Sequence, residues 1–423
     1  MKRTIYYWLL RFFTISAILM SNVLVNAQGY RYDKNKTQKI LHDPINSMGF
    51  VGKLPASYSL RKWAPTPSAQ EGNSCVGWAL AYAAMSITYN QAFNITNKFM
   101  KDMVAFDPVF TYALAKTEST NSCDEGVFFP IALEQMLKYG CKRIIMPPIS
   151  LDCNESVFDH NDAYSAPFVP NEIYAVDLDK VNSIPEKIKV IKSFLANGVP
   201  LPFGMETTRS MMGNGKGNPL VGGLWKPSTD EEMMGGHAMC LIGFSDTRFG
   251  GAFEVMNSWG TGYGEKGFFW IKYADFINRV YELIFIEPIT VRSDNCKIGD
   301  CATDYSYIKR SDGSSYEGMM DAGKPEGYGI YSWVDNSFYA GIWKDGKRHG
   351  AGLLFHNEKI FKCLYSMNDL IEAEPIGFSK DSRNDETEKV IHYLEIRKMQ
   401  VEKIIPKEIS ILLEEQMPPE EWK

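Results

Sequence analysis

Three short segments, far apart in the chain, together carry the residue types of a nucleophilic active site. Residues 70–79 read Gln-Glu-Gly-Asn-Ser-Cys-Val-Gly-Trp-Ala and contain Cys75. Gly-Gly-His-Ala surrounds His237, and Asn-Ser-Trp-Gly begins at Asn257. A thiol needs a base that draws off its proton, and the base needs a partner that fixes its orientation. Each residue alone would be an ordinary side chain, so the prediction depends on all three occurring in this order.

Together these segments resemble the active site of a papain-like cysteine peptidase. The resemblance implies that Cys75 is the nucleophile, that His237 serves as base and then acid, and that Asn257 orients the histidine. It also implies that Trp259 shields the bond between His237 and Asn257 from water. The expected function is hydrolysis of peptide bonds in a polypeptide substrate through a thioester on Cys75. The resting pair is expected to be an ion pair, and no cofactor or metal is expected.

The resemblance assigns an oxyanion donor to Gln70, although the spacing departs from the family pattern. Gln70 lies five residues before Cys75, where the family usually has six. Loss of one such donor typically costs about 2.7 to 4 kcal/mol of transition-state stabilisation. The nucleophile is followed by Val76-Gly77-Trp78, a variant that resembles bacterial branches of the family. Two alternatives stay open: a catalytically silent papain-like domain in a repeat-based binding or scaffold protein, and an acyltransferase that uses the same triad.

Hydrophobic spacing predicts helices before residue 199 and strands after it. Apolar residues recur at helical spacing after Cys75 and place it at the amino end of a helix, which favours a thiolate. Two more helices are predicted at residues 129–139 and 184–195. Strands are predicted at residues 201–205, 238–244, 252–257, 268–271 and 281–287. The expected fold class is α+β, with a two-lobed papain-like domain at residues 54–290, made of a helical lobe and a β-barrel-like lobe.

The last third of the chain contains a repeat with a period of 23 residues. Its matching triplets and glycines are Tyr316-Glu317-Gly318 with Tyr339-Ala340-Gly341, Gly323 with Gly346, and Gly327-Tyr328-Gly329 with Gly350-Ala351-Gly352. This block resembles MORN repeats, which are β-hairpins in a single antiparallel sheet. Two units bury little core alone, so they should pack on the catalytic domain, on the residues that follow, or on a partner protein.

The repeat block defines the expected organisation of the carboxyl-terminal part. Residues 291–308 are polar and are predicted to be a linker, and residues 309–365 are predicted to form the repeats. The segment 366–423 is predicted to be a charged helical tail, because charged and apolar residues alternate in it at helical spacing.

The amino terminus predicts export. Residues 1–27 contain three basic residues, an apolar stretch and a small-residue cleavage site after Ala27, as in a secretory signal peptide. An uncleaved anchor is the alternative, but Arg11 interrupts the apolar run. Removal of the signal leaves 42 basic against 51 acidic residues, a formal charge of −9, so no nucleic-acid partner is expected. No other membrane span is expected, and the mature protein should reach the periplasm, the cell surface or the extracellular space.

Residues 28–53 form a short extension between the signal and the catalytic domain. They are too short for the long helical propeptide of many papain-like enzymes, so self-inhibition by that route is not expected. An oxidising compartment permits disulfides, and the expected pairs are Cys123–Cys153 and Cys296–Cys301.

Two sets of buried or cleft-lining residues are predicted as well. Cys141 and Cys240 lie among apolar residues and are predicted to be buried thiols. Met205, Met211 and Trp225 are candidates for the walls of the cleft, with ordinary core as the alternative.

Overall fold

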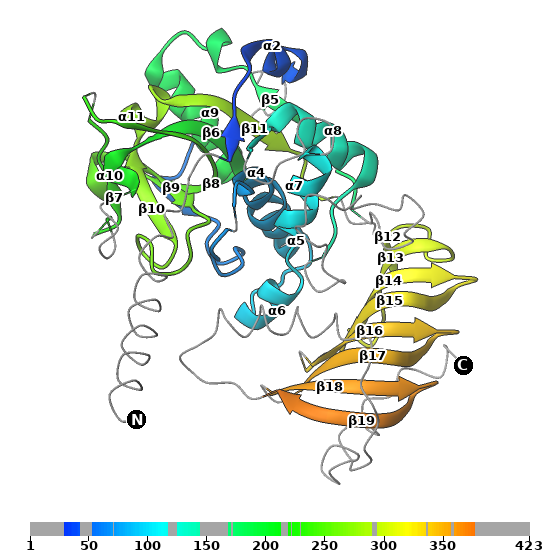
Figure 1. The fold of residues 1–423 in the computed structure, drawn as a ribbon. Helices are drawn as coiled ribbons and strands as arrows, with labels where there is room; N and C mark the ends of the chain where they lie inside the picture. The colour runs from blue at the N-terminus through cyan, green and yellow to red at the C-terminus, as the bar shows by residue number, and fades with distance from the viewer. Residues whose placement is uncertain are drawn as a thin grey trace, which may run out of the picture.

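The structure has three parts: a helical lobe, a sheet lobe and a carboxyl-terminal repeat sheet (Figure 1). The computed structural model describes residues 29–42, 53–70, 72–116, 125–143, 168–170, 172–212, 219–220, 222–228, 230–289, 294–335, 337–356 and 359–376. The predicted signal, the predicted pair Cys123–Cys153 and residues 377–423 of the predicted tail lie outside this part. Among the described residues, no helix is long and apolar enough to cross a bilayer.

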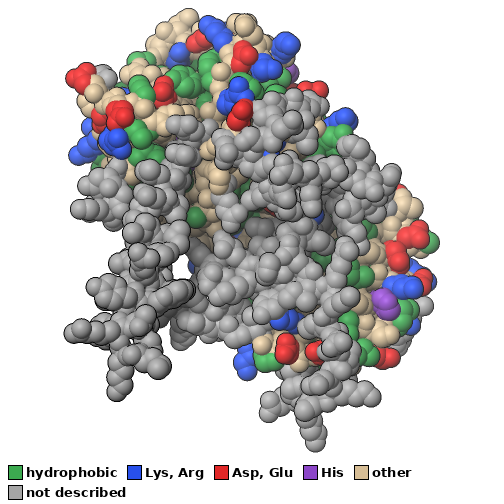
Figure 2. Space-filling view, in the orientation of Figure 1, with side chains coloured by type: hydrophobic (Ala, Val, Ile, Leu, Met, Phe, Trp, Pro, Cys, Tyr) green, Lys and Arg blue, Asp and Glu red, His purple; other side chains and the backbone are tan. Residues whose placement is uncertain are grey.

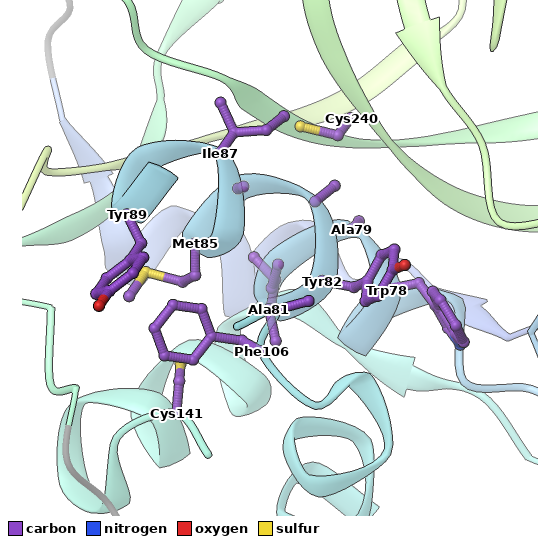
Figure 3. Packing of buried hydrophobic residues seen from close by; sticks show 14 of the residues in the cluster. Trp78, Ala79, Ala81, Tyr82, Met85, Ile87, Tyr89, Phe106, Cys141 and Cys240 are labelled. Atoms are coloured by element: carbon purple, nitrogen blue, oxygen red, sulfur yellow. The ribbon is translucent and has the colours of Figure 1, made fainter. Parts of the chain in front are cut away.

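A buried helical stretch forms the centre of the first lobe. It runs without a break through α4 (Cys75–Gly77), the π-helical segment η2 (Trp78–Met85) and α5 (Ser86–Ala92). Every residue from 75 to 90 is buried, as expected for a helix that is apolar on all sides. Figure 3 shows Ile87 beside Cys240 of the second lobe, and Phe106 beside Cys141. The surrounding helices are α6 (Lys98–Met103), α7 (Pro108–Lys116) and α8 (Phe129–Tyr139).

The position of Gly77, two residues after Cys75, has no room for a side chain. A Cβ atom at this position would lie 1.9 Å from the carbonyl oxygen of Pro108, the first residue of α7. The lack of a side chain therefore lets the amino end of the central helix approach α7 directly.

The second lobe is built on a mixed sheet, with nine strands among the described residues. Their spatial order is β2 (Leu41–His42), β5 (Ile173–Val176), β11 (Val280–Ile286), β6 (Leu201–Thr208), β8 (Met233–Ser245), β9 (Ala252–Met256), β10 (Phe268–Lys272) and β7 (Leu224–Trp225), with β3 (Ser57–Ser59) paired to β8. Strands β6 and β9 and the part of β8 from His237 onward are almost wholly buried, which matches their apolar sequences.

Helix α9 (Ile184–Ala196) packs on this sheet and begins with a side-chain cap at Ser183. The Ser183 hydroxyl accepts the N–H of Glu186 and donates to its carboxylate at 3.0 Å. Short helices α10 (Arg209–Met212) and α11 (Tyr273–Ile277) complete the lobe.

The predicted elements of the two lobes are confirmed within a few residues at their ends. Helices α8 and α9 and strands β6, β8, β9, β10 and β11 occupy the expected places. Met205, Met211 and Trp225 are completely buried in the core of the sheet lobe, which is the second of the two expected alternatives, ordinary core instead of cleft wall. The α+β fold class and the two-lobed arrangement are confirmed.

The carboxyl-terminal part is an antiparallel sheet whose strands follow sequence order (Figure 1). Its strands are β12 (Cys296–Ile298), β13 (Asp304–Lys309), β14 (Ser315–Asp321), β15 (Lys324–Ser332), β16 (Phe338–Lys344), β17 (Lys347–His356), β18 (Lys359–Ser366) and β19 (Asp369–Ile376). Each described strand pairs only with its neighbours, so the sheet is a meander.

This sheet is longer than the sequence predicts at both ends. β12 and most of β13 lie in the expected linker 291–308, and β19 lies in the expected helical tail 366–423. Those two predictions are wrong for the strand residues. The cause is that backbone ladders hold these edge strands, while their mixture of charged and apolar residues does not distinguish a strand from a linker or a helical tail. The predicted disulfide Cys296–Cys301 is confirmed next to the first strand.

Each 23-residue repeat contains a tyrosine whose ring lies over a pair of glycines on neighbouring strands. Tyr316 covers Gly329, where a Cβ atom would be 2.2 Å from the hydroxyl, and Tyr339 covers Gly352 in the same way at 2.5 Å. The Tyr316 hydroxyl then donates to the Met319 carbonyl at 2.9 Å. The glycines are therefore required because each ring occupies the space of two side chains.

A buried ion pair joins the repeat sheet to the helical lobe. Arg143 is fully buried and its Nη2 lies 2.7 Å from the Glu317 carboxylate on β14. The hydroxyls of Tyr89 on α5 and Tyr305 on β13 also donate to Glu317. Burial alone would lower the pKa of Arg143, but Glu317 raises it, so the guanidinium stays charged. The repeat sheet therefore packs on the catalytic domain, one of the expected alternatives.

Aromatic rings enclose the same guanidinium. Its carbon lies 3.8 Å from the ring centroid of Tyr89, 4.0 Å from Phe106 and 4.7 Å from Phe168. The rings exclude water and attract the cation, which makes this contact the chemical centre of the junction.

We predict that Glu317→Leu destabilises the whole chain by about 3 to 5 kcal/mol, because it leaves Arg143 buried without its counter-charge. Chemical denaturation measures the change. Glu374→Leu on β19, whose side chain is 62% exposed, serves as the control and should lower the stability by no more than about 1 kcal/mol. The double variant Arg143→Met/Glu317→Leu should recover much of the loss, since an apolar pair leaves no charge unpaired. Equal stabilities of Glu317→Leu and the wild type would contradict this account.

Candidate active site

Cys75 lies at the contact between the two lobes. It is the first residue of α4, and its sulfur accepts the backbone N–H of Ala238 on β8 at 3.4 Å. The backbone N–H groups of Val76 and of Cys75 itself also favour the thiolate, as expected at a helix amino end. The cysteine that the sequence selects is therefore placed where a residue of the sheet lobe can reach it.

The other two predicted residues of the triad form a hydrogen bond with each other. His237 lies on β8, directly before Ala238, and its Nε2 is 2.8 Å from Oδ1 of Asn257, which follows β9. Its Nδ1 has no hydrogen-bond partner among the described residues. Because Asn257 holds Nε2, the remaining nitrogen is the one available to the thiol.

Trp259 covers the histidine, as the sequence suggests. The two rings are stacked with centroids 4.7 Å apart and an angle of 19° between their planes. The histidine is completely buried. This stacking excludes water from the bond between His237 and Asn257, which strengthens it electrostatically.

Gln70 is fixed beside the triad despite its shortened spacing. Its carbonyl oxygen accepts the Ser258 hydroxyl at 2.7 Å, and its amide nitrogen donates to the Gly72 carbonyl at 2.9 Å. Its backbone N–H also bonds to the Ser258 carbonyl at 2.8 Å. Ser258, which sequence reasoning did not select although it follows Asn257, therefore sets the orientation of the glutamine. An amide nitrogen has two hydrogens, so one remains for an oxyanion.

The amino-terminal extension covers the nucleophile. It comprises β1 (Tyr30–Arg31), α2 (Lys34–Thr37), a 3-10 turn and β2, and β1 pairs in parallel with β4 (Val127–Phe128). A Cβ atom at Gly29 would lie 2.8 Å from the Cys75 sulfur and 2.3 Å from the Asn73 carbonyl oxygen. Only glycine fits this place. The sequence argued only against self-inhibition by a long helical propeptide, and it did not consider that a short strand could cover the site.

Burial of the site shifts the pKa values of the cysteine and the histidine. Burial raises the pKa of Cys75 to about 12, although the N–H groups around the sulfur lower it. Burial lowers the pKa of His237 to about 4, although Asn257 raises it. Burial of both groups therefore favours the neutral thiol and the neutral imidazole over the expected ion pair.

A buried carboxylate of the sheet lobe anchors the extension by two hydrogen bonds. Glu282 on β11 accepts the Tyr30 hydroxyl at 2.9 Å and the Thr37 hydroxyl at 2.6 Å. Burial raises the pKa of Glu282 to about 7, and the two hydroxyls lower it. Sequence analysis selected neither Tyr30 nor Glu282, because no local motif marks a contact between residues 252 positions apart.

Comparisons with known proteins agree with this geometry. Residues 169–281 match the sequence model described as papain family cysteine protease, and residues 316–338 and 339–356 each match the MORN repeat. An uncharacterized peptidase C1-like protein of Acanthamoeba polyphaga mimivirus is 27% identical over 245 residues, which cover 55% of this chain and 75% of that protein.

Solved structures with similar folds include two cysteine proteases. Xylellain from Xylella fastidiosa is 19% identical, with a TM-score of 0.45, over 63% of this chain and 94% of its own. Procathepsin B S9 from Trypanosoma congolense is 14% identical, with a TM-score of 0.46, over 62% and 87%. The matches to the two family models show that this chain carries a papain-family cysteine peptidase domain followed by MORN repeats.

Proposed function

We propose that the protein is an exported peptidase that cleaves polypeptides through a thioester on Cys75. The observation that carries the proposal is the bond of 2.8 Å between His237 and Asn257 on the strand whose next N–H reaches the Cys75 sulfur. It supports a histidine with one nitrogen fixed and the other directed to the nucleophile. Export rests on the character of residues 1–27, which lie outside the described part.

The chemistry follows from these groups. Nδ1 of His237 takes the thiol proton, and the sulfur attacks the carbonyl carbon of the peptide bond. The Gln70 amide and the backbone N–H of Cys75 stabilise the oxyanion. His237 then gives the proton to the departing amine, which leaves the acyl group on sulfur. Water, deprotonated by the same imidazole, hydrolyses the thioester and restores the thiol.

The covered nucleophile suggests that the chain is made in a latent form. Gly29 lies against the Cys75 sulfur in space that a substrate needs, and burial of the site favours the neutral thiol and the neutral imidazole. Displacement or removal of the extension would admit water and substrate together. The ion pair expected for an active enzyme would then form in the opened site.

We predict that Tyr30→Ala raises the rate at which a thiol-directed epoxysuccinyl probe labels Cys75 by at least about tenfold. Truncation of a buried aromatic side chain costs about 3 to 5 kcal/mol, which favours the open state. Peptide mass spectrometry gives the rate, and the buried Cys363 serves as an internal control that should stay unlabelled. Tyr32→Ala, on the exposed side of the same segment, is the matched control variant. Identical rates for Tyr30→Ala and wild type would disprove latency.

The triad has its own test in the Tyr30→Ala chain. His237→Ala should abolish both Cys75 labelling and cleavage of an unfolded protein substrate, because no other group can take the thiol proton. His349→Ala, a histidine of the repeat sheet, should change neither. Labelling that persists at full rate without His237 would argue for a catalytically silent domain. An amine-coupled product in place of a hydrolysed one would identify an acyltransferase.

A third prediction concerns the oxyanion donor. In the Tyr30→Ala chain, Gln70→Ala should lower kcat by about 10² to 10³, while KM changes little. Ser258→Ala should lower kcat less, since it frees the orientation of Gln70 without removing the donor. Steady-state kinetics on one peptide separates the two effects. A Gln70→Ala variant with unchanged kcat would show that the shortened spacing has moved the amide away from the oxyanion.

A further inference from the structure

Polar side chains of the helical lobe hold the segment 62–66, which leads toward the nucleophile. The Asn90 side-chain amide on α5 donates to the Trp63 carbonyl at 2.9 Å. The Lys101 ammonium on α6 donates to the Lys62 carbonyl at 2.8 Å. Both donor residues are buried, so neither bond is exchanged readily for a bond to water. Two helices therefore fix the backbone at the start of this segment.

Thr66 ends the segment, and its N–H, its hydroxyl and its carbonyl are all bound by the same lobe. The Asp102 carboxylate on α6 accepts the Thr66 N–H at 2.6 Å with one oxygen and the Thr66 hydroxyl at 2.7 Å with the other. The Thr66 carbonyl accepts the Tyr82 hydroxyl at 2.6 Å. Hydrogen bonds to a carboxylate are about twice as strong as those between neutral groups, so Asp102 makes the main contact.

The four residues after Thr66 cross to the loop that follows β9 in the sheet lobe. The Ser68 carbonyl accepts the N–H of Gly260 at 3.1 Å, and the N–H of Gln70 donates to the Ser258 carbonyl at 2.8 Å. Gln70 is therefore presented by a short stretch that the helical lobe holds at one end and the sheet lobe at the other.

We propose that Asp102 is a positioning residue for the oxyanion donor, because its contact with Thr66 fixes the stretch that presents Gln70 to the reacting carbonyl. This inference rests on the proposed peptidase function and adds a residue to it. Asp102 does not touch the substrate and acts only through Gln70. An oxyanion donor must already be in place when the charge develops, so a displacement of about 1 Å removes much of its effect.

The first test is a double-mutant cycle in the full chain with Tyr30→Ala, which opens the site. Asp102→Ala should lower kcat by about 10 to 10², with KM changed by less than about twofold. In the chain that also carries Gln70→Ala, the same change should lower kcat by less than about twofold, because the group through which Asp102 acts is gone. Steady-state kinetics on one peptide gives the four values. Equal losses with and without Gln70 would overturn the proposal, since an effect on the fold alone is additive.

A reaction that forms no oxyanion separates positioning from damage to the nucleophile. Iodoacetamide alkylates a thiolate directly, so its rate at Cys75 in the Tyr30→Ala chain should change by less than about twofold on adding Asp102→Ala. The matched control is Asp246→Ala, which removes a carboxylate that accepts Lys192 and Tyr273 in the sheet lobe. It should leave both kcat and alkylation unchanged. A tenfold fall in alkylation with Asp102→Ala would place the effect on the thiol and overturn the proposal.

Two milder variants keep the test valid if Asp102→Ala does not fold. Asp102→Asn retains an acceptor for the Thr66 N–H and should lower kcat less than Asp102→Ala does. Thr66→Val removes the hydroxyl contact alone, and its loss of kcat should also disappear in the Gln70→Ala chain. A loss that persists there would count against the proposal in the same way.

Hydrogen exchange separates this inference from the proposed activity. In the full chain without other substitutions, Asp102→Ala should speed exchange in residues 62–70 by at least about tenfold, while exchange in β8 stays unchanged, because only the segment loses its anchor. Faster exchange without cleavage by any variant would uphold the anchoring and refute the peptidase. Unchanged exchange in a chain that still cleaves peptides would uphold the peptidase and refute the role of Asp102.

Discussion

The contact between the Cys75 sulfur and the N–H of Ala238 is the constraint on which the catalytic domain depends. It joins the amino end of the buried helix to β8, so the nucleophile and the histidine come from different lobes yet meet at one point. One apolar core joins the helical lobe to a face of the sheet, a second core lies within the sheet lobe, and neither lobe contains a complete site. Any shift of one lobe on the other therefore disturbs the shared core and changes the reactivity of the cysteine together.

A second junction fixes the repeat sheet to the opposite end of the same helix. Tyr89 on α5 bonds to Glu317, while Cys75 begins α4 of that continuous stretch. The helix thus has the nucleophile at one end and the repeat sheet at the other.

On the face shown in Figure 2, basic and acidic side chains of the described residues are interspersed.

The features that depend on short motifs or on periodicity could be predicted from the sequence. Cys75, His237, Asn257 and Trp259 are found from their neighbours, because each role needs a particular residue within a short motif, and the structure brings these four together. The helices and strands of both lobes follow from periodicity, since burial of one face imposes it. The repeat was visible because its glycines recur with its tyrosines.

Long-range contacts could not be read in the same way. Tyr30 and Glu282 meet across most of the domain, and nothing near either residue marks the other. Nothing near Arg143 in the sequence indicates that its side chain is buried and paired. In the structure, Glu317 and three aromatic rings enclose it. The edge strands β12 and β19 mix charged with apolar residues, and only their ladders identify them as strands. In each case the decisive partner is distant, so composition and spacing carry no signal.

The order of the repeat sheet has a consequence for how such proteins can diversify. Its strands form a meander, and Glu317 lies on β14, close to the end where the sheet begins. Hairpins added or lost beyond β19 would leave the anchored end unchanged, since each strand depends only on its neighbours. Relatives could therefore carry sheets of different length on the same catalytic domain. The length of the repeat sheet would then evolve independently of the catalytic site.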